Sequence, residues 1–478
     1  MSDHIETHPA VISPTTATSS PSSSPSSSSS LFTTPTKSDT KRLLPLTDPK
    51  ASSSSKKTIS LTYTIVFTFL ACTLFLLYSR SSLSSPTLSA SIHRSRFPSL
   101  LSHFRPTKKN KYEWLEKMVH CDFFHGRWVR DDSYPLYQPT SCPHIDESFD
   151  CARNGRPDRN YDSFKWKPYG CDIPRLNAKH MLKILKGKRL VYVGDSLNRN
   201  MWESMVCLLR NAVKDKSRVF EASKRIEFRT EGSYSFVFED YNCSVEFFSS
   251  PFLVQQWEVL NKNGSKKETL RLDLIETSSD KYSSADFIVF NTGHWWTHEK
   301  TAKGKDYYQE GDHVYSEMSA SEAFQRALRT WGRWVDAKTN SSKTAIFFRG
   351  YSFSHFGGGK WNTGGQCHRN VEPFKNETSR WRYPKKMRVL EKIIKEMKTH
   401  ISYLNVTRMT NFRKDGHPSM YRKQNPTKEE QLTYLTHQDC SHWCLPGVPD
   451  VWNELLYAQI LVRNYHRKQR MLHEKQTK

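Results

Sequence analysis

The chain has 478 residues and a formal net charge of +24, a length that allows two or three domains or one large domain with tails. Residues 1–57 are rich in Ser, Thr and Pro and contain too few apolar side chains to offset the entropy lost on folding. This composition excludes a globular domain at the N-terminus and predicts a disordered tail.

An apolar segment follows the tail. Residues 58–78 (TISLTYTIVFTFLACTLFLLY) contain no charged side chain, and their length matches a helix that crosses a bilayer. The segment starts too far from the N-terminus for a typical cleaved signal peptide, so we predict a single transmembrane signal anchor. Residues 79–111, rich in Ser, Pro and Arg, are predicted to form a stem. We expect one catalytic domain over residues 112–465 and a basic tail over residues 466–478.

Two features predict that the part after residue 78 lies in the lumen of the secretory pathway. Nine of the ten cysteines lie there, which suits disulfide bonds in an oxidising compartment, and their odd number leaves at least one without a partner in this chain. We therefore predict a type II membrane protein with residues 1–57 in the cytosol. All sequons for N-glycosylation also follow the apolar segment, at Asn242, Asn263, Asn340, Asn376 and Asn405.

Most of the positive charge belongs to the predicted luminal part. Six basic and four acidic residues occur up to residue 78, so +22 of the net charge of +24 falls beyond it. A charge of this size is typical of nucleic-acid-binding proteins, but a luminal location excludes that partner. An acidic polysaccharide, an anionic membrane surface and plain solubility remain as explanations.

Short apolar strands alternate with amphipathic helices in the predicted domain. This alternation predicts an α/β fold in which helices cover both faces of a parallel sheet and ligands bind beyond the carboxyl ends of the strands. Alternating segments between residues 218 and 274 are hairpins or additional sheet strands. The predicted strands are 189–193, 287–290, 345–348 and 402–406, and the predicted helices are 198–210, 321–337, 384–398 and 451–462.

Ser196 directly follows the first predicted strand, in the stretch LVYVGDSLNRN. A serine at this point is either the cap of the following helix or a nucleophile. Asp439 and His442 lie three residues apart, just before the last predicted helix, where Pro446 and Gly447 indicate a tight loop. A carboxylate at this spacing can orient the imidazole that deprotonates a serine. We therefore favour catalysis over capping for Ser196.

A zinc site is the rival interpretation of the same loop. His437, Cys440, His442 and Cys444 are residue types that bind zinc, but no second Cys-x-x-Cys pair is found. In an oxidising compartment the two cysteines are expected to form disulfides, for instance with Cys367, and to hold the catalytic loop in place. We expect neither a metal nor another bound cofactor.

The motifs VGDSLNRNMWESM and DCSHWCLPGVPDVWNELL, together with CDFFHGRWVRDDSYPLY, NGRPDRNYDSFKWKPYGCDIPR, NTGHWW and HFGGGKWNTGGQC in this order, resemble the plant trichome birefringence-like family. The catalytic domain of that family is similar to GDSL/SGNH esterases. The resemblance implies a three-layer α/β/α sandwich, anchoring in the Golgi membrane and O-acetylation of cell-wall polysaccharides. It also implies a triad of Ser196, Asp439 and His442. The sequence departs from the family at Phe353, where a proline is common, and this leaves the acceptor polysaccharide open.

Other residues near the predicted strand ends are candidates for the same site. The backbone N–H of Ser196 and the side chain of Asn291 are the predicted oxyanion donors, although Asn291 also suits a turn. Asp195 is expected to cap the helix. Predicted substrate contacts, for which packing or ion pairing is the alternative, are Arg199, His294, Trp295, Trp296, His355 and Trp361.

The sequence therefore predicts transfer of an acetyl group through Ser196 to a hydroxyl of xylan, mannan, xyloglucan or pectin. The resemblance implies that a multispanning membrane protein supplies the acetyl group. An esterase would use the same triad with water as acceptor. A non-catalytic protein that bridges pectin and other wall polysaccharides, and so maintains pectin esterification, is the hypothesis from another class.

Overall fold

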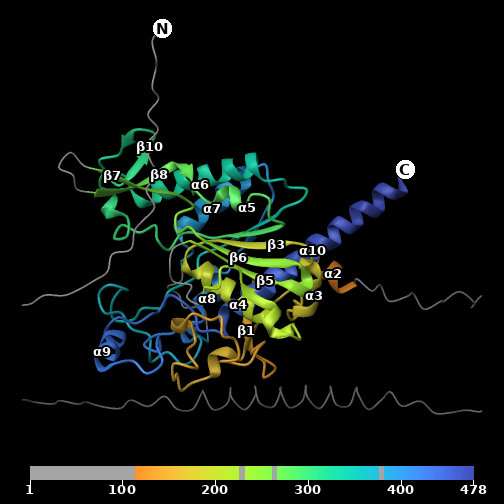
Figure 1. The fold of residues 1–478 in the computed structure, drawn as a ribbon, viewed down its shortest axis with the longest axis horizontal. Coiled ribbons are helices and arrows are strands. Elements are labelled where there is room, and N and C mark those ends of the chain that lie inside the picture. The colour runs from red at the N-terminus through yellow and green to blue at the C-terminus, as the bar shows by residue number, and fades with distance from the viewer. Residues whose placement is uncertain (1–112, 226–231, 261–265, 376–381, 478) are drawn as a thin grey trace, which may run out of the picture. The chain divides into compact units, whose positions relative to one another are not determined.

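The predicted tail, anchor and stem, residues 1–57, 58–78 and 79–111, lie outside the described residues. Among the residues that are described, no helix has the length and apolar character needed to cross a bilayer. The computed structural model describes residues 113–225, 232–260, 266–375 and 382–477 (Figure 1).

A seven-stranded sheet forms the centre of the fold, and the four predicted strands are all in it. Neighbouring strands are parallel from β13 to β6, whereas β6, β5 and β4 form an antiparallel meander. The sheet is therefore mixed rather than wholly parallel. In sheet order the strands are β13 (Ile401–Leu404), β12 (Ala345–Arg349), β9 (Phe287–Phe290), β3 (Arg189–Gly194), β6 (Cys243–Ser249), β5 (Ser233–Phe238) and β4 (Val219–Glu221).

Helices cover both faces of this sheet, as predicted (Figure 1). Successive side chains of a strand point to opposite faces, so Leu190 and Tyr192 of β3 join one apolar cluster and Val191 and Val193 the other. A strand buried on both faces is apolar throughout, which explains the uninterrupted run in β3. The first cluster contains α3 (Ala178–Leu185), α4 (Ser196–Ala212) and α10 (Val448–Gln476), and the second contains α6 (Ala320–Lys338) and α7 (Lys385–Glu396).

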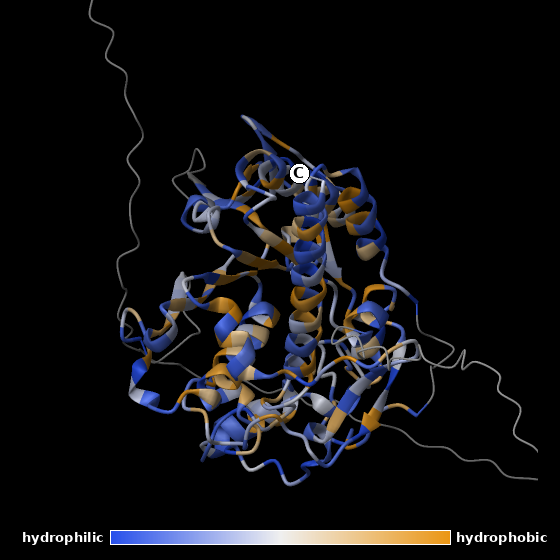
Figure 2. Ribbon diagram, turned by 90° about the vertical axis from the view of Figure 1, so that its right-hand side faces the viewer, coloured by the Kyte–Doolittle hydropathy of each residue, from blue (hydrophilic) through white to orange (hydrophobic). Residues whose placement is uncertain are grey.

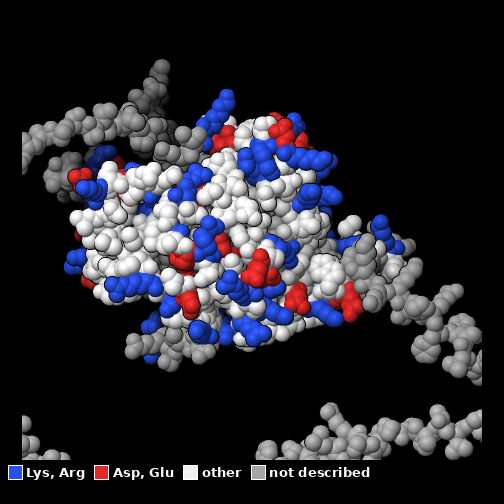
Figure 3. All heavy atoms as spheres, turned by 90° about the horizontal axis from the view of Figure 1, so that it is seen from below, with Lys and Arg blue, Asp and Glu red and all other residues white. Residues whose placement is uncertain are grey.

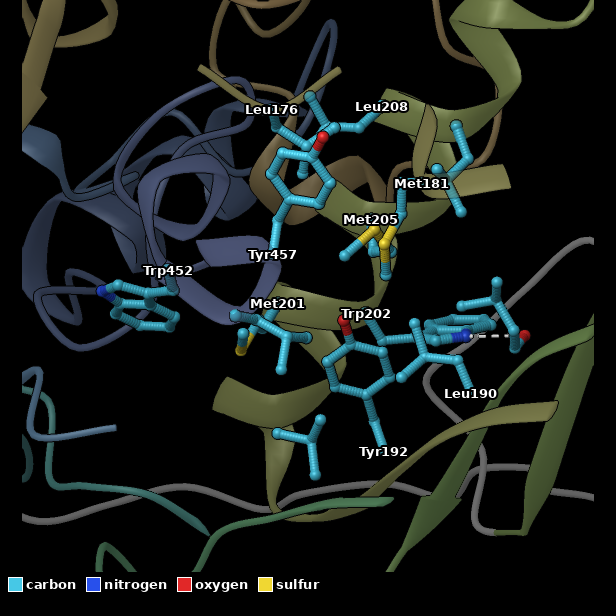
Figure 4. Close-up of a cluster of buried hydrophobic side chains, with 14 of the residues drawn as sticks. Leu176, Met181, Leu190, Tyr192, Met201, Trp202, Met205, Leu208, Trp452 and Tyr457 are labelled. Atoms are coloured by element: carbon cyan, nitrogen blue, oxygen red, sulfur yellow. Dashed lines mark hydrogen bonds between the residues drawn. The ribbon is translucent and has the colours of Figure 1, made fainter. Parts of the chain in front are cut away.

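Trp202 of α4 lies in the middle of the first cluster (Figure 4). Its indole N–H donates to the carbonyl of Val245 in β6 at 3.0 Å, so a large apolar side chain is buried without leaving its polar atom unpaired. Trp452 and Tyr457 of α10 pack on the same cluster. This packing fixes α4, and with it Ser196, against the sheet.

Helix α10 continues through residues 466–476, which were expected to be a tail. Figure 2 shows hydrophilic residues along its last turns. The strands between residues 218 and 274, whose place was left open, belong to two sheets. β5 and β6 belong to the central sheet, and β8 belongs to a separate four-stranded sheet. The remaining elements of the described ranges are α2 (Glu113–Val119), β1 (Gly126–Arg130), β2 (Phe164–Pro168), β7 (Val254–Leu260), β8 (Lys266–Ile275), α5 (Ser279–Tyr282), β10 (Tyr308–Glu310), β11 (His313–Val314), α8 (Thr407–Asn411), α9 (Lys428–Thr436) and six short 3₁₀ turns.

Of the nine cysteines after residue 78, eight form four disulfides, and the ninth, Cys243, is a buried free thiol. The prediction that Cys440 and Cys444 form disulfides is confirmed, and Cys367, the partner named as an example, pairs with Cys440. The other pairs are Cys121–Cys171, Cys142–Cys207 and Cys151–Cys444.

The sequons differ in accessibility. Asn242 and Asn340 are exposed, whereas Asn405 is half-buried and its sequon threonine, Thr407, is buried. The folded chain therefore presents the first two as acceptors more openly than the third. Asn263 and Asn376 lie outside the described residues.

Two carboxyl groups of α10 are fully buried. Asp450 accepts hydrogen bonds from the Ser204 hydroxyl at 2.5 Å and the Gly447 N–H at 2.8 Å. Glu454 accepts from the Tyr134 hydroxyl at 2.9 Å and the Leu176 N–H at 3.0 Å. Burial raises the pKa of Asp450 and the pKa of Glu454 to about 7. Both groups are therefore protonated in the folded protein over a pH range in which the unfolded chain ionises them.

The carboxyl groups of Asp450 and Glu454 predict that the protein is more stable in mild acid than at neutral pH. Because their pKa values are higher in the folded than in the unfolded protein, their contribution to the free energy of unfolding is complete below about pH 4 and is lost as the pH rises through about 7. Asp450→Asn should reduce the fall in unfolding free energy between pH 5 and 8 by about 3 kcal/mol, measured by urea denaturation. The control is Asp280→Asn at an exposed position. An unchanged pH dependence in Asp450→Asn would contradict the prediction.

Candidate active site

Ser196 is the first residue of α4 and follows β3 after a single residue, Asp195. The Asp195 carboxylate accepts the Leu197 N–H at 3.0 Å, and the Asp195 carbonyl accepts the Asn198 N–H at 2.9 Å. Asp195 is therefore the helix cap, as expected, and the Ser196 hydroxyl does not have that task.

The structure brings Ser196, His442 and Asp439 together. His442 Nε2 lies 2.7 Å from Ser196 Oγ, and His442 Nδ1 lies 2.7 Å from Asp439 Oδ2. The other carboxylate oxygen, Oδ1, accepts the backbone N–H groups of Ser441 at 3.1 Å and His442 at 3.0 Å. Burial raises the pKa of Asp439, but the charge and hydrogen bond of His442 outweigh it and hold that pKa well below its usual value. The carboxylate is thus ionised and fixed beside the imidazole.

The loop that carries Asp439 and His442 is tied to the fold on both sides. Disulfides join Cys440 to Cys367 and Cys444 to Cys151. Because the sulfur of each loop cysteine is bonded to another cysteine, neither Cys440 nor Cys444 is available as a zinc ligand. In addition, the backbone of Asp439 pairs with that of Ser419, through bonds of 2.8 and 2.9 Å.

This arrangement has the chemistry of covalent acyl transfer. A serine hydroxyl faces an imidazole nitrogen, and a carboxylate holds the other nitrogen, which keeps the reactive nitrogen free of its proton. The His442 side chain is 25% exposed and that of Asp439 is 10% exposed, so a substrate can approach the imidazole while the carboxylate stays shielded.

Asn291 does not fit the predicted oxyanion role. It is fully buried, its Oδ1 accepts the Asp195 N–H at 3.0 Å, and its Nδ2 donates to Asp195 Oδ1 at 2.7 Å. A Cβ on Gly194 would lie 1.9 Å from Asn291 Oδ1, and the φ of Gly194 is +151°. Only glycine therefore allows this contact. Asn291 therefore shapes the turn before Ser196, and the Ser196 N–H stays the predicted oxyanion donor.

Arg199 is also a structural residue rather than a substrate contact. Its Nη1 donates to Asp146 Oδ2 at 2.7 Å and to Glu203 Oε1 at 3.1 Å. The guanidinium lies 4.9 Å above the ring of Phe149, and that ring packs 5.1 Å from the imidazole of His442. Arg199 therefore supports the site through the packing of Phe149.

The predicted aromatic contacts divide into packed and exposed side chains. Trp296 is 1% exposed and donates its indole N–H to Thr292 Oγ1 at 2.9 Å, so it belongs to the core. His294 is largely buried and lies between the Asp195 carboxylate at 3.3 Å and the Ser352 carbonyl at 2.8 Å. Neither position is open to a sugar.

Trp295 and Trp361 remain available, with 36% and 47% exposed surface. Lys300 Nζ lies 4.3 Å from the Trp295 ring and 5.2 Å from the Trp361 ring, so one cation joins the two indoles. Lys300 was not predictable as part of this group, because a lysine in a polar loop carries no signal of its own. Aromatic faces of this kind stack on sugar rings.

A hollow of about 800 Å³ lies beside the catalytic loop. His355 lines it and donates its backbone N–H to the Cys440 carbonyl at 2.9 Å, and Ser354 Oγ lies 2.8 Å from Ser441 Oγ. The described residues that line the hollow include three basic side chains and no acidic one: Arg369, Arg382 and Lys414. On the face drawn in Figure 3, by contrast, Lys and Arg are spread among Asp and Glu, which is typical of a solvated surface.

Comparison with known proteins identifies the family of the chain. A model described as the GDSL/SGNH-like acyl-esterase family found in Pmr5 and Cas1p matches residues 173–459, and a model of the PMR5 N-terminal domain matches residues 119–172. The chain belongs to this family. The first match contains Ser196, Asp439 and His442, and the second covers the two-stranded sheet of β1 and β2, so both parts of the family contribute to the described fold.

Curated relatives from Arabidopsis thaliana place the chain more closely. It is 60% identical to Protein trichome birefringence over 356 residues, which are 74% of this chain and 59% of the relative. It is 61% identical to trichome birefringence-like 1 over 349 residues, 73% and 63% of the two chains. For trichome birefringence-like 4 the values are 51% over 384 residues, 80% and 84%. The resemblance drawn from the motifs is therefore confirmed, and the chain spans about three fifths of the first two relatives.

Proposed function

We propose that the chain is an O-acetyltransferase that acetylates hydroxyls of a plant cell-wall polysaccharide through an acetyl-Ser196 intermediate. The observation that carries the proposal is the pair of 2.7 Å contacts linking Ser196 to His442 and His442 to Asp439. Membership of an acyl-esterase family supports acyl transfer as the reaction class. The exposed indoles of Trp295 and Trp361 support a carbohydrate acceptor.

The reaction has two halves. Ser196 Oγ attacks the acetyl carbonyl of the donor while His442 Nε2 takes its proton, and the oxyanion that forms is stabilised by the Ser196 N–H. His442 then protonates the leaving group, which departs. In the second half, His442 takes the proton of an acceptor hydroxyl, and the hydroxyl oxygen attacks acetyl-Ser196. Collapse of the second tetrahedral intermediate releases the acetylated polymer and returns the proton to Ser196.

The location and the donor belong to the same proposal. Four disulfides support folding in an oxidising lumen, and we place the catalytic part in the Golgi lumen behind the predicted anchor at residues 58–78. A multispanning membrane partner would deliver acetyl groups there. The acceptors we consider are xylan, mannan, xyloglucan and pectin.

The test is to incubate the full-length protein with para-nitrophenyl acetate, with and without deacetylated xylan or homogalacturonan. We expect peptide mass spectrometry to find an acetyl group on Ser196, which is lost on addition of acceptor as acetyl enters the polymer. Acetate release without polymer acetylation would indicate an esterase. Polymer binding that persists in Ser196→Ala, with no acetyl-serine in the wild type, would overturn the proposal in favour of a bridging protein.

A further inference from the structure

Two imidazoles form a continuous chain of contacts behind the catalytic loop. His417 Nδ1 lies 2.6 Å from the carbonyl oxygen of His442, and His417 Nε2 lies 2.7 Å from His355 Nδ1. At the far end, His355 Nε2 lies 2.9 Å from the carbonyl oxygen of Asn411. These contacts thus connect the backbone of His442, the predicted catalytic base, to the end of α8. No side chain of the triad takes part in them.

The three contacts fix the number of protons. Carbonyl oxygens only accept, so the ring nitrogens that face Asn411 and His442 must each carry a hydrogen. The two remaining nitrogens, one on each ring, face each other at 2.7 Å and need a third hydrogen between them. Two neutral imidazoles carry only two hydrogens, and with two the facing lone pairs would repel. Three hydrogens give His355 and His417 together one positive charge.

The surroundings contain both opposing and supporting features. Burial lowers the pKa of His355 and the pKa of His417, which opposes the charge. Against this, His417 stacks on the indole of Trp443 at 4.2 Å, and one side of His355 lines the hollow beside the catalytic loop. Arg156 donates to the His417 carbonyl at 2.7 Å and forms an ion pair with Asp158. Arg413 forms an ion pair with Asp415 at 2.8 Å. The other charged or titratable groups around the two histidines are Lys414, Asp439 and His442.

We propose that His355 and His417 are positioning residues that share a third proton, and that this cationic pair holds the His442 backbone in place for proton exchange with Ser196. A charged donor makes a shorter and stronger hydrogen bond than a neutral one, in agreement with the 2.6 Å contact to the His442 carbonyl. The kinetic part rests on the proposed acyl transfer, whereas the proton count stands independently of any activity.

The proton count is tested by nitrogen-15 NMR of the full-length protein labelled at histidine. Resonances are assigned through His355→Leu and His417→Leu. We expect three nitrogen-bound hydrogens on the two rings below the pH at which the pair loses its charge. Two hydrogens throughout the pH range of the folded protein would overturn the proposal, whether or not the protein transfers acetyl groups.

The positioning role is tested by the pH dependence of kcat for acetyl transfer. His355→Leu removes the partner ring and should lower kcat between about 10- and 100-fold. We expect wild-type kcat to fall as the pH rises past the point at which the pair loses its proton, and His355→Leu should abolish that fall. His355→Gln keeps an amide donor for the Asn411 carbonyl and an acceptor for His417 Nε2, so it should recover part of the loss.

The matched control for these variants is His437→Leu, which removes an exposed histidine of the neighbouring segment. It should leave kcat and its pH profile at wild-type values. A profile in His355→Leu identical to that of the wild type would overturn the positioning role, and so would an equal loss in His437→Leu.

Discussion

Replacing Ser196 by alanine is expected to lower acetyl transfer by about 10⁶-fold, because the residual rate comes only from substrate binding and the oxyanion donor. Ser196 Oγ is the atom 2.7 Å from His442 Nε2, and alanine removes that atom without disturbing the cap, which Asp195 provides. Initial rates of acetyl incorporation into polymer, at matched thermal stability, measure the effect. The control is Ser321→Ala, an exposed serine in the first turn of α6.

In the same assay, Asp439→Asn distinguishes the role of the nucleophile, Ser196, from the role of the residue that orients His442. It should leave Ser196 in place but lower kcat by about 10³- to 10⁴-fold, because an amide no longer favours the required tautomer of His442. If Ser196→Ala kept more than a tenth of the wild-type rate, the serine would not be the nucleophile.

Removing the disulfide between Cys151 and Cys444 is expected to be the most damaging change outside the triad. The bond joins residues 293 positions apart, and both cysteines are fully buried. The double variant Cys151→Ser, Cys444→Ser should lower the free energy of unfolding by about 2–5 kcal/mol, since a long loop is released in the unfolded chain. It should also lower acetyl transfer, because Cys444 is two residues after His442. Guanidinium denaturation and initial rates measure the two effects.

The comparison is with Cys121→Ser, Cys171→Ser, which breaks a disulfide spanning 50 residues at the N-terminal edge of the fold. This control should lose less stability and keep its rate per folded molecule. Equal losses of rate in the two double variants would mean that the disulfide at Cys444 has no special relation to the catalytic loop.

The central fold was predictable because its strands and helices carry local signals. The apolar run of β3 and the helical spacing in α6 are determined by burial on both faces of one sheet, and each is visible in a window of a few residues. The meander of β4 to β6 was not placed, because its alternating pattern suits the central sheet and a separate sheet equally well. Which sheet it joins is decided by long-range pairing with β3.

The three triad residues, which the structure brings together, were predictable because their residue types and their positions beside strand ends indicate their roles. Asn291 and Arg199 show the opposite case. Both occupy suitable positions in the sequence, yet the first bonds to Asp195 and the second to Asp146, partners 96 and 53 residues away. The His355–His417 chain was not found either, since two histidines 62 residues apart show no pattern until the fold joins them.

The separation of 246 residues between Ser196 and His442 has a consequence for biosynthesis. A ribosome delivers the nucleophile long before its base, so a nascent or truncated chain carries an unreactive hydroxyl. Cys444 and Cys440, on either side of His442, form disulfides with Cys151 and Cys367, and neither bond can form before the last part of the chain has been synthesised. Under the proposed mechanism, the reactivity of Ser196 therefore depends on completed oxidative folding, so a check on the fold is also a check on the chemistry.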